Sequence, residues 1–154
     1  MPTYKDISSF SDWAKDDRDQ FALAVIKGLI MDTVRKANSG HTGGPMSSAD
    51  FTYILFTEYL NFDPKDSEWC KRDRFVLSAG HESALLYVLL TMIGWLNIDD
   101  LQAIRKLHSK TPGHPEVQIK GVEATTGPLG QGVGMGIGMA VAESKIREMF
   151  SNYT

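Results

Sequence analysis

The sequence predicts an α/β domain that is mostly helical and contains one or a few parallel strands. Three observations predict this class. The chain of 154 residues is 42% hydrophobic, which suits one globular domain with a sizeable core. Several segments repeat apolar residues at helical spacing, whereas one short apolar run between turn residues is typical of a buried strand. Because a lone buried strand leaves its backbone groups unpaired, the sequence reads as the opening of a parallel sheet with helices.

The first two helices are separated by a loop rich in helix breakers. A helix is expected over residues 18–37, and Gly40 is its expected stop. The apolar residues on its buried face are Phe21, Val25, Leu29, Ile30 and Val34. After "GHTGGP", a second helix is expected from about Ser47, where "SSAD" offers a cap and an acid three residues on, to about Leu60.

The middle of the chain contains the predicted strand and two further helices. A charged connector leads to "FVLS", residues 75–78, which is the one persuasive strand. "ALLYVLLTMI", residues 84–93, predicts a buried helix that stops at Gly94, and a short helix is expected from Asp99 to about Leu107.

The last helix is expected from about Leu129 to Phe150 and is rich in glycine. Glycine costs a helix interior up to about 1 kcal/mol relative to alanine. Since the glycines alternate along the segment, they cover two helical faces and predict close packing against other backbone. They are Gly132, Gly134, Gly136 and Gly138.

Charge and composition exclude several classes of function. A net charge of −3 gives no general affinity for nucleic acid or for an anionic membrane. The lone Cys70 excludes an internal disulfide and fits a reducing compartment. The first residues lack the pattern of a signal peptide, and the longest apolar run is too short to span a bilayer. We therefore expect a soluble, cytoplasmic protein.

Three loops place glycine directly before histidine, at His41, His81 and His114. A fourth loop, "TTGPLGQG" at 125–132, opens a helix without charge. Helix N-termini favour anions, and imidazole can donate hydrogen bonds and transfer protons near neutral pH. One Gly-His pair is most often an ordinary turn, but three pairs in loops between elements favour a site for a phosphorylated cofactor or substrate. His108, by contrast, is expected to complement the dipole at a helix end.

Other catalytic motifs do not fit. "HESAL" begins like the metalloprotease pattern but has Leu85 where the second histidine is required. The glycines after residue 126 do not form a dinucleotide fingerprint, since Ile137 occupies the last glycine position. One cysteine and no clustered histidine pairs argue against a zinc site, so no metal ligand is assigned. Glu82, Glu116 and Glu123 adjoin the loops without a paired-acid spacing, and solvated faces or caps are expected for most of them.

The four loops together resemble the start of transketolases. The matching pieces, in order, are "SGHTGGP", "DRFVLSAGHES", "LHSKTPGHPE" and "GVEATTGPLGQG", and the resemblance runs from about Leu29 to Met149. It implies that residues 1–154 are a partial diphosphate-binding (PP-type) domain of the thiamine-diphosphate fold, with no complete second domain. The family transfers a two-carbon ketol unit from a ketose phosphate to an aldose phosphate and belongs to the pentose phosphate pathway.

The resemblance also implies roles for individual residues. His41 matches the histidine that faces the substrate and takes part in proton transfer. His81 matches the histidine at the cofactor diphosphate, and His114 the one near the thiazolium and the ketol hydroxyls. Gly127 and Leu129 match backbone positions that line thiamine diphosphate. The expected metal is Mg²⁺ or Ca²⁺, whose ligands lie beyond residue 154 in the family pattern.

Some residues depart from the family pattern. Thr42 stands where proline is usual, and Ala79 and Glu82 replace other residues beside His81. A carboxylate beside a diphosphate repels it unless it turns away or is paired. The metal-binding segment and the glutamate that activates the aminopyrimidine belong to later parts of the family's chain.

We therefore expect weak cofactor binding and no ketol transfer by this polypeptide alone, which would act as a homodimer or with a complementing transketolase chain. We also expect self-association in isolation. Two alternatives remain: another thiamine-diphosphate enzyme such as dihydroxyacetone synthase, or a non-catalytic remnant that serves as an interaction module.

Overall fold

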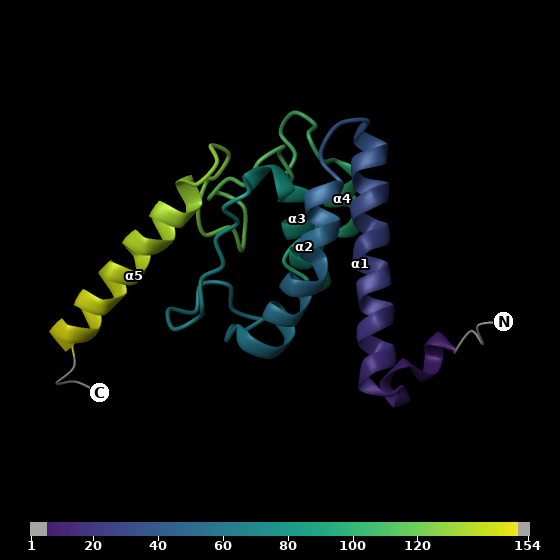
Figure 1. Ribbon diagram of the computed structural model, residues 1–154, viewed down its shortest axis with the longest axis horizontal. Coiled ribbons are helices and arrows are strands. Elements are labelled where there is room, and N and C mark those ends of the chain that lie inside the picture. Colours follow the sequence, from purple (N-terminus) through teal and green to yellow (C-terminus); the bar gives the residue numbers. More distant parts are fainter. Residues whose placement is uncertain (1–5, 151–154) are drawn as a thin grey trace.

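Three helices pack around a buried fourth in the computed structural model, which describes residues 6–150 (Figure 1). The elements in chain order are a 3-10 turn at Ile7–Asp12, α1 at Lys15–Ala37, α2 at Gly43–Ile54 with a π-helical turn at Leu55–Tyr59, a 3-10 turn at Gly80–Glu82, α3 at Ser83–Met92, α4 at Ile98–Gln102 and α5 at Gln131–Phe150. Within the described residues no helix combines the length and the apolar character that crossing a membrane requires.

Helix α3 forms the centre of the core. Every residue from Ser83 to Leu90 is buried, because α1, α2 and α4 all pack against this helix. Ile26 and Ile30 of α1 and Ala49 of α2 are almost fully buried in the same cluster. This agrees with the buried helix expected at residues 84–93. The buried position of α3 fixes its N-terminus, which directly follows the turn that carries His81.

Helix α1 ends where the sequence predicts and begins three residues earlier, at Lys15. Arg35 and Lys36 lie in its last turn, where cations complement the helix dipole, and Asn38 closes it in a left-handed conformation with φ of 48°. Phe21, expected on the core face, is instead 38% exposed. Its ring packs against Phe10 and Trp13, with centroids 5.7 and 5.5 Å away.

Helix α2 begins at Gly43, four residues before the predicted start at Ser47. Pro45 lies in the first turn, where a missing backbone N–H costs nothing because no earlier carbonyl is available for it. The Ser47 hydroxyl donates to the Gly44 carbonyl inside the helix at 3.0 Å and does not cap it. The π-helical turn extends the segment to Tyr59, next to the predicted end at Leu60.

The predicted strand at residues 75–78 is wrong for the part of the chain that the structure describes. These residues form no ladder, and the one β-bridge within residues 6–150 joins Asp63 and Asp66. A strand requires a paired neighbour for its N–H and C=O groups, and within residues 6–150 no backbone–backbone hydrogen bond joins residues 75–78 to another segment. Phe75 and Leu77 still pack against the core, so the apolar pattern reports burial rather than a sheet.

The short helix α4 ends at Gln102, well before the predicted end at Leu107. Arg105 and His108 adopt positive φ values of 62° and 61°, which an α-helix cannot contain. His108 therefore lies beyond α4 in an irregular turn, and its expected role at a helix end is wrong.

Helix α5 extends away from the other helices (Figure 1). A side chain added at Gly132 would meet Ser78, so this glycine permits the close packing that the sequence predicts. The expectation fails for the other three glycines, Gly134, Gly136 and Gly138, which have no neighbouring atom within 4 Å of an added Cβ. Large apolar side chains on α5 are exposed, among them Val133, Ile137, Val141 and Ile146.

Candidate functional site

The structure brings the loops of His41 and His81 together. Their imidazole rings meet edge to face, with centroids 4.9 Å apart and planes inclined by 64°. His41 lies just before α2 and is exposed, whereas His81 lies in the 3-10 turn before α3 and is half-buried. Since both loops lead into helices that pack in the core, the positions of the two imidazoles are set by the packing of α2 on α3.

The backbone of the His81 loop packs directly against the backbone of residues 125–132. A Cβ added at Gly80 would lie 2.7 Å from the carbonyl carbon of Thr126 and 2.8 Å from the nitrogen of Gly127. Real Cβ atoms do not approach so closely, so glycine is required at position 80. A second contact fixes the same pair of segments, because the Val133 N–H donates to the Ser78 hydroxyl at 3.1 Å.

The loop of His114 is fastened from both sides. The Ser83 hydroxyl donates to the Gly113 carbonyl at 2.9 Å, and the Tyr87 hydroxyl donates to the His114 carbonyl at 3.1 Å. The Thr126 N–H donates to the carbonyl of the buried Pro115 at 3.2 Å. Three bonds to successive carbonyls hold this backbone, while the His114 side chain stays exposed.

Gly127 lies beside the His114 ring. A Cβ added at this glycine would be 3.5 Å from Cδ2 of the imidazole, in ordinary van der Waals contact. Gly127 is half-buried, whereas the predicted neighbour Leu129 is 76% exposed. The four loops singled out in the sequence therefore form one continuous surface, from His41 through His81 and Gly127 to His114.

Glu82 turns its carboxyl group toward the first turn of α2. Its Cδ lies 2.9 Å from the place that a Cβ of Gly44 would take, so glycine at this position makes room for the side chain. A carboxylate at a helix N-terminus is favoured by the helix dipole. This placement directs the negative charge of Glu82 into α2 and gives Gly44 a specific function in the first loop.

Thr126 was not predicted and carries a buried hydroxyl without a hydrogen-bond partner among the described residues. The residue is 3% exposed, and its Oγ1 lies 2.8 Å from the position of a Cβ at Gly80. Buried hydroxyls nearly always have a partner, so an unpaired one at the junction of two loops marks a place where a further polar group fits.

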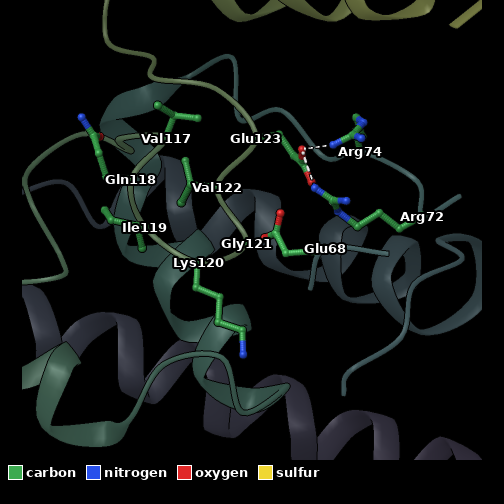
Figure 2. A pocket seen from close by; sticks show the side chains of 10 residues that line it. All are labelled: Glu68, Arg72, Arg74, Val117, Gln118, Ile119, Lys120, Gly121, Val122 and Glu123. Atoms are coloured by element: carbon green, nitrogen blue, oxygen red, sulfur yellow. Dashed lines mark hydrogen bonds and ion pairs between the residues drawn. The ribbon is translucent and has the colours of Figure 1, made fainter. Parts of the chain in front are cut away.

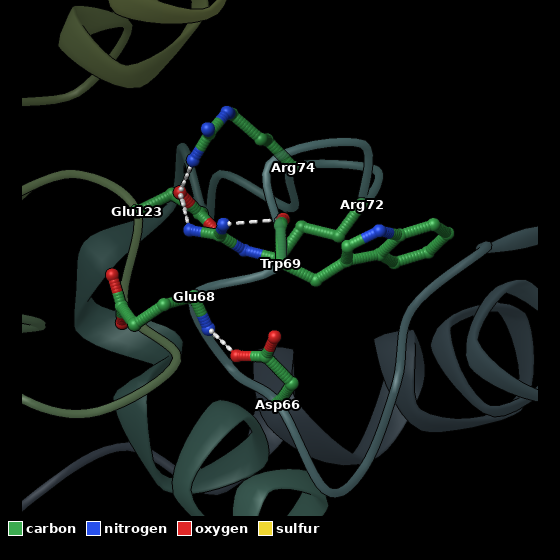
Figure 3. Close-up of polar contacts among 6 residues, drawn as sticks. All are labelled: Asp66, Glu68, Trp69, Arg72, Arg74 and Glu123. Carbon is green, nitrogen blue, oxygen red and sulfur yellow. Dashed lines mark hydrogen bonds and ion pairs between the residues drawn. The ribbon is translucent and has the colours of Figure 1, made fainter.

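A cluster of charged side chains joins residues 72–74 to Glu123, just before the loop at residues 125–132. Glu123 pairs with Arg72 through two bonds, at 2.9 and 3.2 Å, and accepts a third from Arg74 at 2.7 Å (Figure 3). The side chains of Arg72 and Glu123 are each only 10% exposed. Glu123 is therefore an exception to the solvated faces or caps expected for most of these carboxylates, because Arg72 and Arg74 cover it.

The same ion pairs border a cavity of about 340 Å³ between residues 68–74 and 117–123 (Figure 2). None of the three loop histidines lines this cavity. Lys120 and Glu68 complete its charged wall. This cavity is therefore not part of the candidate site, and the charged residues that line it hold the neighbouring loops in place. Among residues 6–150 no group of three or more His, Cys, Asp or Glu side chains is arranged to hold a metal ion.

Glycine and histidine loops that converge beside packed helices are the arrangement expected of a domain for a diphosphate-bearing cofactor. Residues 18–153 match the family model of the transketolase thiamine diphosphate binding domain. The chain belongs to the transketolase family and corresponds to its thiamine diphosphate binding domain.

Individual relatives agree with this assignment. The transketolase of Staphylococcus epidermidis is 51% identical over 137 residues, which cover 88% of this chain and 21% of that protein. Among solved structures, transketolase from Leishmania mexicana has a TM-score of 0.83 at 44% identity, covering 86% of this chain and 20% of that one. Transketolase from Pichia stipitis in complex with sedoheptulose 7-phosphate has a TM-score of 0.75 at 46% identity, covering 84% and 19%. The chain thus spans about one fifth of the length of these relatives.

Proposed function

We propose that this chain supplies part of the diphosphate-binding domain of a transketolase, which transfers a two-carbon ketol unit between sugar phosphates. The observation that carries the proposal is the contact of Gly80 with Thr126 and Gly127, which joins the loop of His81 to the loop that His114 lies against. Family membership supports the same function, since the matching domain model is the one that binds thiamine diphosphate.

The residues present fit thiamine diphosphate on three grounds. The surface between the loops carries imidazoles as hydrogen-bond donors, and Thr126 offers an unpaired hydroxyl at its junction. Glu82 directs its carboxyl group toward Gly44 in the first turn of α2, where the helix dipole favours a negative charge. Thiamine diphosphate supplies the carbanion chemistry when it is bound, and the protein supplies position and proton carriers.

Each histidine has a proposed task. His81 donates to the diphosphate, as its position before the N-terminus of α3 favours an anion. His114 lies at the reacting end of the cofactor and binds hydroxyl groups of the ketol, with the backbone of Gly127 and Leu129 lining the cofactor. His41 faces the sugar and moves protons to and from its hydroxyls, a task that suits an exposed imidazole.

The substrates, the metal and the partner chain follow from the family relationship. We propose sugar phosphates as substrates, since the related Pichia stipitis structure is a complex with one. Mg²⁺ or Ca²⁺ would accompany the diphosphate, held by ligands outside residues 6–150. Ketol transfer would require the parts of a transketolase that this chain does not match, supplied by a homodimer or by a complementing chain.

Calorimetric titration of the chain with thiamine diphosphate and Mg²⁺ tests cofactor binding. We expect weak binding, and a dissociation constant about ten- to a hundredfold higher in His81→Ala, because a hydrogen bond to a charged group contributes roughly 1.5–3 kcal/mol. His108→Ala is the matched control and should bind as the wild type does. Thiamine without its diphosphate should bind far more weakly; equal binding of thiamine would contradict the proposal.

A chimera tests the activity. In it, this chain replaces the matching segment of Staphylococcus epidermidis transketolase, to which it is 51% identical. We expect the chimera to transfer a ketol unit between sugar phosphates. A folded, dimeric chimera that binds thiamine diphosphate but transfers nothing would favour a non-catalytic interaction module.

A further inference from the structure

Arg105 connects the loop of His41 to the loop of His114. It follows α4 in an irregular turn, and its guanidinium reaches both loops. Nη1 donates to the Ser39 hydroxyl at 3.1 Å, two residues before His41. On the other side, a Cβ added at Gly113 would lie 3.2 Å from Cζ of Arg105, directly before His114. One side chain therefore contacts both of these Gly-His loops.

The guanidinium lies between two glycines. Gly40 precedes His41, and a Cβ there would be 3.7 Å from Nε of Arg105. A Cβ at Gly113 would be 3.4 Å from both Nε and Nη2, so the planar group covers this glycine. Glycine at position 113 leaves the space that the guanidinium occupies, whereas a Cβ at Gly40 would be in ordinary van der Waals contact with it. A planar group suits this narrow gap, whereas a lysine ammonium offers no flat face.

The backbone of Arg105 is itself fastened to the second loop. Its N–H donates to the Thr111 carbonyl at 2.8 Å, and the Thr111 hydroxyl donates to the Asp100 carbonyl at 2.6 Å. Thr111 is completely buried. Arg105 adopts a φ of 62°, and this left-handed conformation costs a non-glycine residue about 1 kcal/mol or more. Such a conformation persists only where surrounding contacts enforce it.

We propose that Arg105 is a positioning residue that sets the separation of His41 and His114. This role rests on the proposed function, in which both imidazoles act on the same bound ketol. Arg105 does not touch the reacting atoms and acts through Ser39, Gly40 and Gly113. Figure 1 shows that the loop after α1 and the loop that follows α4 lie at the same end of the molecule, where this residue joins them.

The test follows the ring signals of the histidines by NMR in isotope-labelled chain without cofactor. Signals of His41 and His114 are assigned with His41→Gln and His114→Gln. We expect Arg105→Gln to shift the ring signals of both histidines and to leave the Trp13 indole signal in place. Lys106→Gln is the matched control, since it removes the same charge from the neighbouring exposed residue and should shift neither signal.

Two further variants keep the proposal falsifiable. Arg105→Lys retains the charge but not the planar group, and we expect it to shift both signals as well; full recovery of the wild-type signals would overturn the proposal. If Arg105→Gln loses the Trp13 signal and is unfolded, Ser39→Ala replaces it. This variant removes one hydrogen bond and should shift His41 alone, and an unchanged His41 signal would overturn the proposal.

A cofactor measurement separates this inference from the proposed function. We expect thiamine diphosphate to bind about tenfold more weakly to Arg105→Gln than to Lys106→Gln, a loss of roughly 1.4 kcal/mol. If the wild-type chain binds no thiamine diphosphate, the proposed function fails while the histidine signals still decide whether Arg105 couples the loops. Equal affinity in the two variants, with binding intact in the wild type, contradicts the role of Arg105.

Discussion

The imidazole rings of His41 and His81 meet edge to face, with centroids 4.9 Å apart, although the whole of α2 lies between them in sequence. Aromatic rings at this distance and inclination attract one another weakly. The contact adds to the packing of Glu82 against Gly44, which joins the same two loops. It also places a proton carrier directly beside the residue proposed to bind the diphosphate.

His41→Ala in the chimera should reduce kcat by about a hundredfold or more, because general acid–base catalysis contributes roughly 10²–10⁴-fold. Its affinity for thiamine diphosphate should stay within about threefold of the wild type, since the proposed diphosphate ligand is His81. Steady-state kinetics and a cofactor titration on the same preparation measure both quantities. A loss of affinity as large as the loss of kcat would assign His41 to the cofactor.

Gly80→Ala should destabilise the fold by about 1–3 kcal/mol, because the new methyl group would meet the backbone of Thr126 and Gly127. Gly134→Ala is the opposite case, since nothing lies within 4 Å of its added Cβ. There the better helix propensity of alanine should stabilise the chain by up to about 1 kcal/mol. Thermal unfolding followed by circular dichroism measures both changes, and shifts of the same sign would contradict the packing described here.

Glu123→Ala should cost about 3 kcal/mol or more of unfolding free energy, because it leaves the buried guanidinium of Arg72 without its partner. Glu143→Ala is the matched surface case. Its ion pair with Arg147 is exposed on both sides, and its loss should cost less than about 0.5 kcal/mol. Urea denaturation at neutral pH compares the two variants; equal costs would show that burial of the Glu123 cluster contributes nothing.

The stability of the chain should fall as the pH rises from about 10 to about 12. Burial and the hydrogen bond to Asp19, 2.7 Å long, raise the pKa of Tyr53 to about 12. The unfolded chain loses this proton near pH 10, so the folded state binds more protons in between and loses stability as they leave. Burial also raises the pKa of Tyr87, which adds to the loss of stability at alkaline pH. Tyr53→Phe should reduce the alkaline slope in urea denaturation across this range, and an unchanged slope would exclude Tyr53 as its source.

Self-association in isolation should depend on the apolar surface of α5. Ile137 is 61% exposed, and replacing it with lysine removes apolar surface without disturbing the core. Analytical ultracentrifugation should show a smaller mass for Ile137→Lys than for the wild type at high concentration. A wild-type chain that sediments as a monomer throughout would contradict the expectation.

Sequence reasoning finds the glycine and histidine loops and helix α3 more reliably than the segments between them. The loops of His41, His81 and His114 are recognisable because glycine and proline mark turns locally, and their order along the chain resembles one family. Helix α3 is equally clear, since a run of apolar residues without breakers has few other structures open to it. These features depend on neighbouring residues and need no knowledge of distant contacts.

The features that sequence reasoning missed depend on distant partners. Glu123 is buried by Arg72 and Arg74, which lie about fifty residues earlier and show no pattern that identifies them. Arg105 falls inside the helix predicted to reach Leu107, and only the early end of α4 frees its side chain to join two loops. The strand at residues 75–78 is wrong for a related reason: an apolar run predicts burial, but only a paired neighbour makes it a strand.

The contact between Gly80 and Thr126 has a consequence for synthesis on the ribosome. A chain grows from its N-terminus, and domains form as their segments emerge. Helices α1 to α4 can pack against one another once residue 104 has emerged, and Val122 completes their core, yet the surface around His81 still lacks the segment that packs against it. Until residues 125–132 follow, the nascent chain can be folded and still be unable to bind the proposed cofactor. Cofactor added during translation should therefore leave the folding of shorter nascent chains unchanged.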